Sequence, residues 1–415
     1  MAFLPAVALR SLDAAVDADL VDVLAITRHV LGRAGDTVLA EIESVQGRAS
    51  GRFAYEARRG GPHFAVEVAK LAAAGRYRGV PFPLEVSQGE VSYAGDRLRV
   101  RGLAGSVGGS RLQGGGEAEV VFGAEPGVRW ARAAFLLVLD ELYPWLASLE
   151  RLQPALKELK SLTGTAAVRL VRLSGPFADP AAFDFEAVVQ PRELRASVTE
   201  LPAPLALAGG EASVTRRALQ LDRLQASLLD ARVTVSGTVR DYASSDRRID
   251  LTLGDGAAGQ QALDWVRTRW RVPAKAMPRA PLSLAGGRLQ WPADAPGSLA
   301  AQGTVGLAEK VDAEFDLTWR PDNLDLRRLS LKDADSDATI ALKWAAARAD
   351  LAFRGTLDNR TVERLLAPPP EVQGSLRGDF RASIDLDAPR RSTAAGTLEG
   401  EGLDVLERWN LPVLI

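Results

Sequence analysis

The chain has 415 residues, of which 47% are hydrophobic and 25% charged, with 53 acidic and 51 basic side chains. This composition is typical of a folded protein with a large core. The formal net charge of −2 does not indicate the basic surface that binds nucleic acid. Cysteine is absent, which excludes disulfides, thiol nucleophiles and thiolate metal sites. The longest apolar run, residues 133–139, is shorter than the ~20 residues of a membrane-spanning helix.

Taken in chain order, short helices alternate with long stretches of strand. Helical spacing of apolar residues predicts helices over 20–33, 142–159, 260–270 and 359–366. Pro144 fits the first turn of the second helix if that helix begins near Tyr143, and Pro154 should kink or split it. Strict alternation of apolar and polar residues predicts half-buried antiparallel strands, which include 97–101, 183–187, 219–222, 232–236, 315–319, 324–327 and 384–387.

The strands and helices follow an internal repeat. The segment beginning Pro83-Leu84-Glu85-Val86 returns 121 positions later as Pro204-Leu205-Ala206-Leu207, and Leu98/Leu219 keep the same spacing. We therefore expect four units, each a short helix followed by a meander, over 1–139, 140–258, 259–357 and 358–415, the last incomplete. Such arrays bury the faces of their units against neighbours and work through an extended surface.

The alternation gives the predicted sheet one apolar face that four short helices cannot cover. Large exposed apolar patches are rare without a purpose, so either a second sheet closes this face or an apolar ligand lies on it. The predicted fold is mainly β, an elongated, repetitive antiparallel meander that forms a curved sheet or groove, with short helices at the repeat boundaries. The candidate groove-lining residues are Val91, Tyr93, Leu98, Val100, Phe185, Leu219, Leu221, Val233, Val235, Phe315, Leu317, Leu324 and Leu326.

Patterns typical of catalysis or metal binding are missing from the sequence. The two histidines, His29 and His63, are far apart in the repeat, and no nucleophile elbow, zinc-protease motif or phosphate loop is present. Residues 333–337 resemble the start of a calcium loop but lack its glycine and glutamate, so they predict a turn between strands. The tryptophans are interpreted as core or groove-rim residues. We expect no catalytic residue, metal or cofactor.

The glycine and proline pattern resembles that of the AsmA-like superfamily, most closely its YhdP type and more distantly TamB. The resemblance lies in Gly47, Gly51 and Phe53, repeated as Gly374, Gly378 and Phe380, in the Pro-Leu segments that begin at 83, 204 and 281, and in 396–403. It implies a periplasmic protein, anchored in the inner membrane, whose apolar groove binds phospholipid acyl chains and moves or organises phospholipid between the inner and outer membranes.

The sequence lacks the amino-terminal membrane helix of that superfamily, so we expect an internal fragment whose anchor lies outside this chain. Protein partners in either membrane are not identified by any motif. The alternative hypothesis is a non-enzymatic β-rich structural or adhesive scaffold, whose apolar face is closed by protein.

Overall fold

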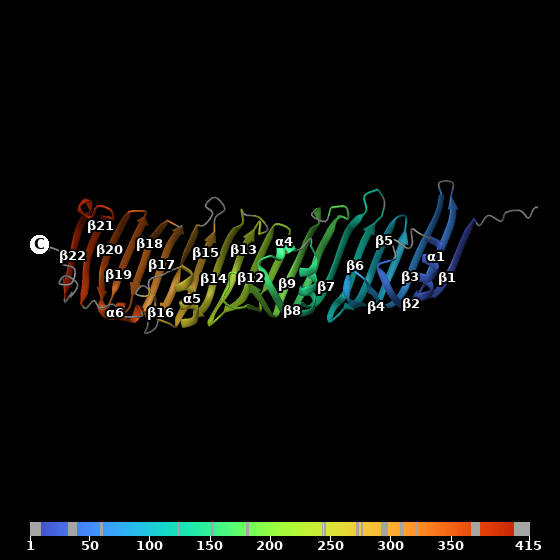
Figure 1. Cartoon of the computed structure of the whole chain (residues 1–415), viewed down its shortest axis with the longest axis horizontal. Coiled ribbons are helices and arrows are strands. Elements are labelled where there is room, and N and C mark those ends of the chain that lie inside the picture. Colours follow the sequence, from blue (N-terminus) through green and yellow to red (C-terminus); the bar gives the residue numbers. More distant parts are fainter. Residues whose placement is uncertain are drawn as a thin grey trace, which may run out of the picture. The chain divides into compact units, whose positions relative to one another are not determined.

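The computed structural model describes residues 10–31, 40–58, 61–122, 124–150, 153–179, 182–242, 244, 246–270, 274, 277–291, 298–307, 311–320, 322–366 and 374–401. Most of these residues lie in strands, and the helices between them are short (Figure 1). This confirms a mainly β, antiparallel meander with a few short helices. Residues 32–33, 151–152, 372–373 and 402–403, which belong to the predicted helices and motifs, lie outside the described residues.

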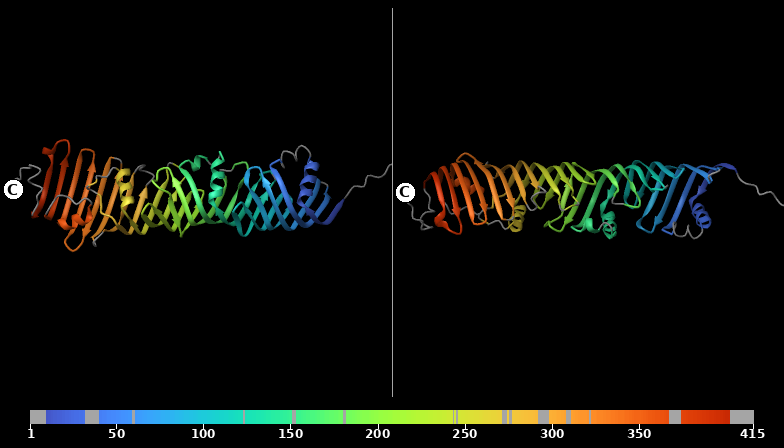
Figure 2. Two further views of the ribbon diagram at one scale, coloured as in Figure 1. Left: turned by 60° about the horizontal axis from the view of Figure 1, so that its bottom comes forward. Right: turned by 90° about the horizontal axis from the view of Figure 1, so that it is seen from above.

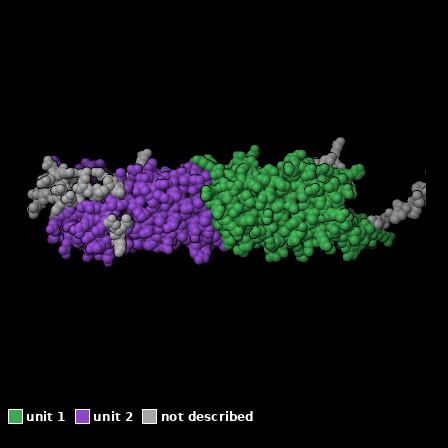
Figure 3. All heavy atoms as spheres, turned by 90° about the horizontal axis from the view of Figure 1, so that it is seen from below, with its two compact units in different colours: residues 1–196, 212–216 green, residues 197–211, 217–415 purple. Residues whose placement is uncertain are grey.

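The chain divides into two compact units (Figure 3). Unit 1 comprises residues 1–196 and 212–216, and unit 2 comprises 197–211 and 217–415. This division does not test the four repeat boundaries, which stay a prediction.

In unit 1, each strand from β1 to β7 pairs antiparallel with the next strand along the chain, and β11 pairs antiparallel with β9. The strands are β1 (Ser11–Asp19), β2 (Ile42–Arg58), β3 (Gly61–Tyr77), β4 (Val80–Ala94), β5 (Arg97–Val107), β6 (Ser110–Val121), β7 (Gly127–Val138), β8 (Leu159–Pro176), β9 (Asp184–Val198) and β11 (Glu211–Thr215). The helices are α1 (Leu20–Leu31), α3 (Leu139–Ser148) and α4 (Gln153–Leu156).

In unit 2, each strand from β12 to β21 pairs antiparallel with the next, and β10 pairs with β12. The strands are β10 (Leu205–Ala208), β12 (Ala218–Leu228), β13 (Ala231–Arg240), β14 (Arg248–Ala258), β15 (Leu282–Trp291), β16 (Leu299–Leu307), β17 (Val311–Arg320), β18 (Asn323–Lys332), β19 (Asp337–Ala345), β20 (Arg348–Asp358), β21 (Ser375–Asp385) and β22 (Thr393–Glu401). The helices are α5 (Gln260–Trp270), α6 (Asn359–Leu365) and the 3-10 turn η4 (Pro389–Arg391).

The helices lie where the sequence predicts them, with one correction. The helix predicted over 142–159 is two helices, α3 and α4, so the predicted break near Pro154 is present. The placement of Pro144 in a first turn was wrong, because α3 begins at Leu139 and Pro144 lies inside it. Burial of Leu139, Leu142 and Tyr143 extends the helix upstream. Because proline has no backbone N–H group, α3 lacks one backbone hydrogen bond at Pro144.

Candidate functional site

The strands of unit 2 share one apolar face. Residues that pair across an antiparallel ladder point to the same side of the sheet, and successive residues alternate sides. The pairings place apolar residues opposite one another from strand to strand, in rows that cross the sheet. Three such rows are Trp319, Leu324, Trp344, Ala349 and Ile384; Leu317, Leu326, Leu342, Leu351 and Ala382; and Phe315, Leu329, Ile340, Phe353 and Phe380.

Unit 1 has the same arrangement. One row crosses six strands, from β1 to β6, through Ala14, Phe53, Val66, Tyr93, Leu98 and Val120. Tyr93 of this row has two aromatic neighbours: the ring centroids of Phe64 and Tyr93 are 6.1 Å apart, and those of Tyr93 and Phe122 are 6.5 Å apart. These contacts confirm that the three rings lie on one side of the sheet.

All thirteen candidate groove residues lie on strands and are half-buried. The pairings place twelve of them on the apolar face of their own unit: Val91, Tyr93, Leu98 and Val100 in unit 1, and Leu219, Leu221, Val233, Val235, Phe315, Leu317, Leu324 and Leu326 in unit 2. Phe185 lies on β9. Their neighbours Arg97, Arg99, Gln220 and Asp222 are exposed. That any of them contacts a ligand remains a prediction.

β-Bulges keep the apolar residues on one face of long strands. In β18, Leu326 pairs with Leu342 and Leu329 pairs with Ile340, so two residues, Arg327 and Arg328, stand opposite one residue of β19. Both arginines bind carboxylates of β17: Arg327 pairs with Asp316, and Arg328 with Glu314 at 2.9 Å. Two consecutive side chains on the polar face are the signature of a bulge, which also bends and twists the strand.

The opposite face of each sheet is polar and carries ion pairs between neighbouring strands. In unit 1, Glu119 is only 3% exposed. It accepts hydrogen bonds from Arg99 at 2.8 Å and Arg129 at 3.3 Å. The Arg99 hydrogen bond lowers the pKa of the Glu119 carboxyl, despite the opposing effect of burial. In unit 2, Arg288 forms a two-pronged pair with Asp250 and lowers its pKa in the same way.

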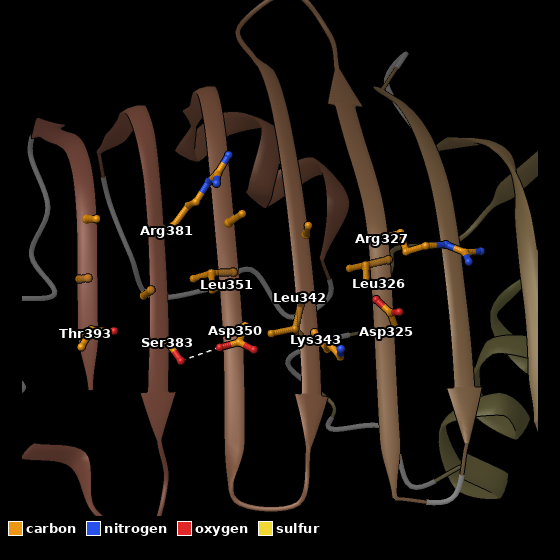
Figure 4. A pocket seen from close by; sticks show the side chains of 15 residues that line it. Asp325, Leu326, Arg327, Leu342, Lys343, Asp350, Leu351, Arg381, Ser383 and Thr393 are labelled. Carbon is orange, nitrogen blue, oxygen red and sulfur yellow. Dashed lines mark hydrogen bonds between the residues drawn. The ribbon is translucent and has the colours of Figure 1, made fainter. Parts of the chain in front are cut away.

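A shallow depression of about 520 Å³ over β18 to β22 has a mixed lining, in which charged residues such as Asp325, Lys343 and Arg381 alternate with leucines and alanines (Figure 4). Its charges are partly satisfied within the sheet, since Ser383 donates a hydrogen bond of 2.6 Å to Asp350, which Arg348 also contacts. It is therefore a weaker candidate for an apolar ligand than the opposite face.

In unit 2, α6 packs on the apolar face at one end of the strands. Leu365 of α6 joins Val311, Ala313 and Leu331 in a buried cluster. Because neighbouring strands run in opposite directions, the start of β17, the end of β18 and the end of β20 lie at the same edge of the sheet. The chain passes from β20 into α6 at this edge, which we call the helix rim of unit 2 (Figure 2).

A polar turn holds α6 in place. Thr361 is fully buried and donates a hydrogen bond of 2.8 Å to Asp333, and Arg364 pairs with Asp333 at 3.0 Å and with Asp335 at 2.7 Å. Burial acts to raise the pKa of Asp333, but the bonds from Thr361, the backbone N–H groups of Asp335 and Ser336, and Arg364 outweigh it and lower the pKa. The turn predicted at 333–337 thus docks a helix. Among the described residues, no group of three His, Asp or Glu side chains could hold a metal ion.

In unit 1, α3 covers an apolar cavity of about 460 Å³ on the apolar face. Leu84 and Val86 of β4, Leu112 of β6 and Phe135 of β7 line it below, and Leu142 and Trp145 of α3 line it above.

Polar bonds from α3 tie the helix across the strands. Gly109 N–H donates to Glu141 at 2.8 Å, Gly164 N–H donates to Asp140 at 2.8 Å, and the Trp145 indole donates to Gly79 O at 3.0 Å. The sequence analysis did not identify the six residues that line the cavity beneath α3 as a site. The spacing of Leu142 and Trp145 on one helix face was the available signal, but only the fold shows which strands they meet.

Comparisons with known proteins give no relative: no family model, no curated protein and no solved structure matches the chain. In the part of the chain that the structure describes, none of the helices has the length and apolar character needed to cross a membrane.

Proposed function

We propose that this protein binds the acyl chains of phospholipids on the apolar faces of its sheets and, without catalysing a reaction, conducts or organises phospholipid between the inner and outer membranes of a bacterial envelope. The observation that supports lipid binding is the set of apolar rows that cross each unit, in which most side chains stay partly exposed. The envelope location and the membrane anchor rest on the resemblance to the AsmA-like superfamily.

The half-exposure of the rows also favours lipid binding over a closed scaffold. A scaffold would bury this face against a second layer of protein, whereas Leu317, Leu326 and Leu342 stay half-exposed. Leaving apolar area in water costs about 25 cal/mol per Å², so a ligand with acyl chains would gain free energy by covering it. The cavity beneath α3 has the same apolar lining and is partly covered by a helix.

Photo-crosslinking on alternate residues of one strand tests this proposal. A photoreactive phenylalanine replaces Leu221 or Leu326 on the apolar face, and Gln220 or Arg327 on the polar face serves as the matched control. After incubation with vesicles of phosphatidylethanolamine and phosphatidylglycerol and irradiation, mass spectrometry should find lipid adducts at Leu221 and Leu326 but not at the controls, because side chains alternate faces along a strand. Equal capture on both faces, or no capture by folded protein, would favour the scaffold.

A further inference from the structure

The space beneath a helix is filled in unit 2 and hollow in unit 1. Both α6 and α3 follow directly from a strand and lie on the apolar face of their own unit. Beneath α6, Leu365 joins Val311, which is 0% exposed, and Leu331, which is 5% exposed, in one cluster. Beneath α3, a cavity of about 460 Å³ remains between the helix and the strands. A helix on this face does not require such a hollow, so the cavity beneath α3 needs its own explanation.

One row of paired residues forms the floor of the cavity. From β4 to β7 the row consists of Val86, Gly105, Leu112 and Phe135. Gly105 has no side chain, so nothing from β5 fills the row between Val86 and Leu112. A larger residue cannot take its place, because a Cβ atom there would lie 2.0 Å from the carbonyl oxygen of Glu85. The close approach of β5 to β4 therefore keeps this gap in the floor.

Polar bonds to the turns hold α3 above this floor. Glu141 accepts a hydrogen bond of 2.8 Å from the N–H group of Gly109, in the turn between β5 and β6. The Trp145 indole donates a hydrogen bond of 3.0 Å to the carbonyl oxygen of Gly79, in the turn between β3 and β4. The Trp145 ring also packs edge-on against Phe82, with the ring centroids 6.3 Å apart. These contacts fix the helix at the ends of the strands, so it does not depend only on packing against the floor.

The lining of the cavity suits hydrocarbon and not a charged group. Among the described residues that line it, the charged ones are Glu85 and Arg111. Both pair with Ser106 in the row that alternates with the floor, so their exposed side chains lie on the polar face. The buried hydroxyl of Ser110 already accepts a hydrogen bond of 2.9 Å from the N–H group of Val138. A phosphate group would lose its hydration here, which is costly, whereas an apolar chain gains free energy by leaving water.

The size of the cavity selects one acyl chain. Because an apolar cavity of ~150 Å³ holds benzene, the cavity of about 460 Å³ has room for roughly 18 carbon atoms. Its floor crosses three strand spacings from β4 to β7, roughly 14 Å at ~4.8 Å each. The acyl chains of one leaflet occupy a similar depth, about half of a ~30 Å hydrocarbon core. From these observations we infer that one acyl chain of a phospholipid lies beneath α3, across β4 to β7, with the headgroup outside the cavity. This inference rests on the proposed function.

Phosphatidylglycerol with a diazirine at the end of one acyl chain tests the site on the unmodified protein. After irradiation, peptide mapping should place adducts on α3 and on the segments 84–86, 103–107, 110–112 and 135–137. Adducts confined to other strands of the apolar faces would overturn the site beneath α3 and leave the proposed function intact. A lack of adducts anywhere on folded protein would overturn both. Hexadecanoic acid with the same diazirine is tested in parallel, and adducts from this acid alone would overturn a phospholipid as the occupant.

A cavity-filling variant tests the size of the site. Lysophosphatidylglycerols of increasing chain length compete with the diazirine probe for α3. Their affinity should rise about fourfold per methylene group, at ~0.8 kcal/mol each, until the cavity is full. In Leu112→Phe the rise should stop at a shorter chain. Val233→Phe is the control, because Val233 holds the matching place, 121 positions later, in the row of Leu207, Ala226 and Gly256 in unit 2. The same limiting length in Leu112→Phe and the unmodified protein, or an equal shift in Val233→Phe, would contradict a chain beneath α3.

Discussion

At the scale of single residues, Glu119 is the most constrained charge on the polar face of unit 1. Its side chain is 4% exposed, while Arg99 and Arg129, which bind it, are 45% and 57% exposed. A buried carboxylate is stable only when its oxygens are bonded, and here two guanidinium groups supply those bonds while themselves reaching water. Most other ion pairs on the polar faces join two exposed side chains, which contribute little to stability.

Glu119→Gln should therefore lower the free energy of unfolding of unit 1 by about 1–3 kcal/mol, the cost of losing hydrogen bonds to a charged group in a buried site. Asp13→Asn is the matched control: Asp13 pairs with Arg52 across β1 and β2, but both side chains are more than half exposed. The control should change stability much less, because water screens an exposed ion pair. Urea denaturation of both variants measures the difference, and equal losses would show that burial of Glu119 does not matter.

At the scale of elements, bulges recur at matching positions of the repeat. Val100-Arg101-Gly102-Leu103 of β5 and Leu221-Asp222-Arg223-Leu224 of β12 are 121 positions apart, and both are bulges. Gly102 and Arg223 both have positive φ, 60° and 47°. The local signal is an apolar pair separated by two residues that are not apolar, Arg101-Gly102 in β5 and Asp222-Arg223 in β12, within an otherwise alternating strand.

Deleting Arg328 should give a folded protein. Removal of this residue leaves Leu326-Arg327-Leu329, which alternates strictly and can pair with both β17 and β19 without a bulge. Only the exposed pair with Glu314 is lost, a cost of about 1 kcal/mol or less.

Deleting Ser330 instead provides the contrast. This deletion makes Leu329 and Leu331 adjacent. One of the two leucines must then turn to the polar face, and the residues between it and that end of the strand change face with it. We expect a loss of about 1.5–3 kcal/mol for each displaced leucine. Soluble yield and thermal melting followed by circular dichroism compare the two deletions, and equal behaviour would contradict the bulge argument.

The docking of α6 depends on one buried hydroxyl. Thr361 bonds to Asp333 and lies 2.6 Å from the hydroxyl of Ser336, which in turn accepts a hydrogen bond from the backbone N–H of Asp358. Thr361→Val keeps the shape of the side chain but removes the hydrogen bond to Asp333 and the contact with the Ser336 hydroxyl, while the other bonds of these two groups remain.

Thr361→Val should cost about 1–3 kcal/mol because a buried carboxylate and hydroxyl lose a hydrogen bond. Hydrogen exchange of residues 361–366 should become faster, since their protection depends on the docking of α6. Glu363→Ala, a change on the exposed side of the same helix, is the control and should leave exchange unchanged. Unaltered exchange in Thr361→Val would show that apolar packing of Leu365 alone holds the helix.

At the scale of the whole molecule, carboxylates on both units titrate below their ordinary range. The pKa values of Asp13, Glu119, Asp250, Asp333 and Asp350 are all lowered, chiefly by hydrogen bonds from arginine, serine or threonine side chains or from backbone N–H groups. A carboxyl whose pKa is lower in the folded than in the unfolded state contributes stability that is fully present above the unfolded pKa, near 4, and is lost as the pH falls through the folded pKa.

The free energy of unfolding should therefore stay nearly constant between about pH 7 and pH 5 and decrease below about pH 4. Urea titrations at a series of pH values measure this, and Asp333→Asn should show a smaller decrease because one lowered carboxyl is absent. A loss of stability between pH 7 and pH 5 would require a different group, and would contradict an origin in these carboxylates.

The sequence by itself determined which residues share a face and where the helices near 20, 260 and 359 start. Strict alternation identified the apolar side of the strands, as at Leu219 and Leu221 against Gln220, because side chains in a strand have a period of two that depends only on local spacing. The helices near 20, 260 and 359 followed from apolar periodicity in the same way, and the acidic run at 333–337 was correctly predicted to be a turn between strands.

Only the tertiary structure decided what meets across the sheet. Three contacts join residues from separate elements: the pairing of Leu324 with both Trp319 and Trp344, the cavity between α3 and β4, and the hydrogen bond of Asp333 with Thr361 of α6. No local period in the sequence specifies such partners. The start of α3 at Leu139 also depended on burial against the sheet, which outweighed the local preference of Pro144. Register and docking are set by the total apolar area that many strands bury together, so they appear only when the sheet is assembled.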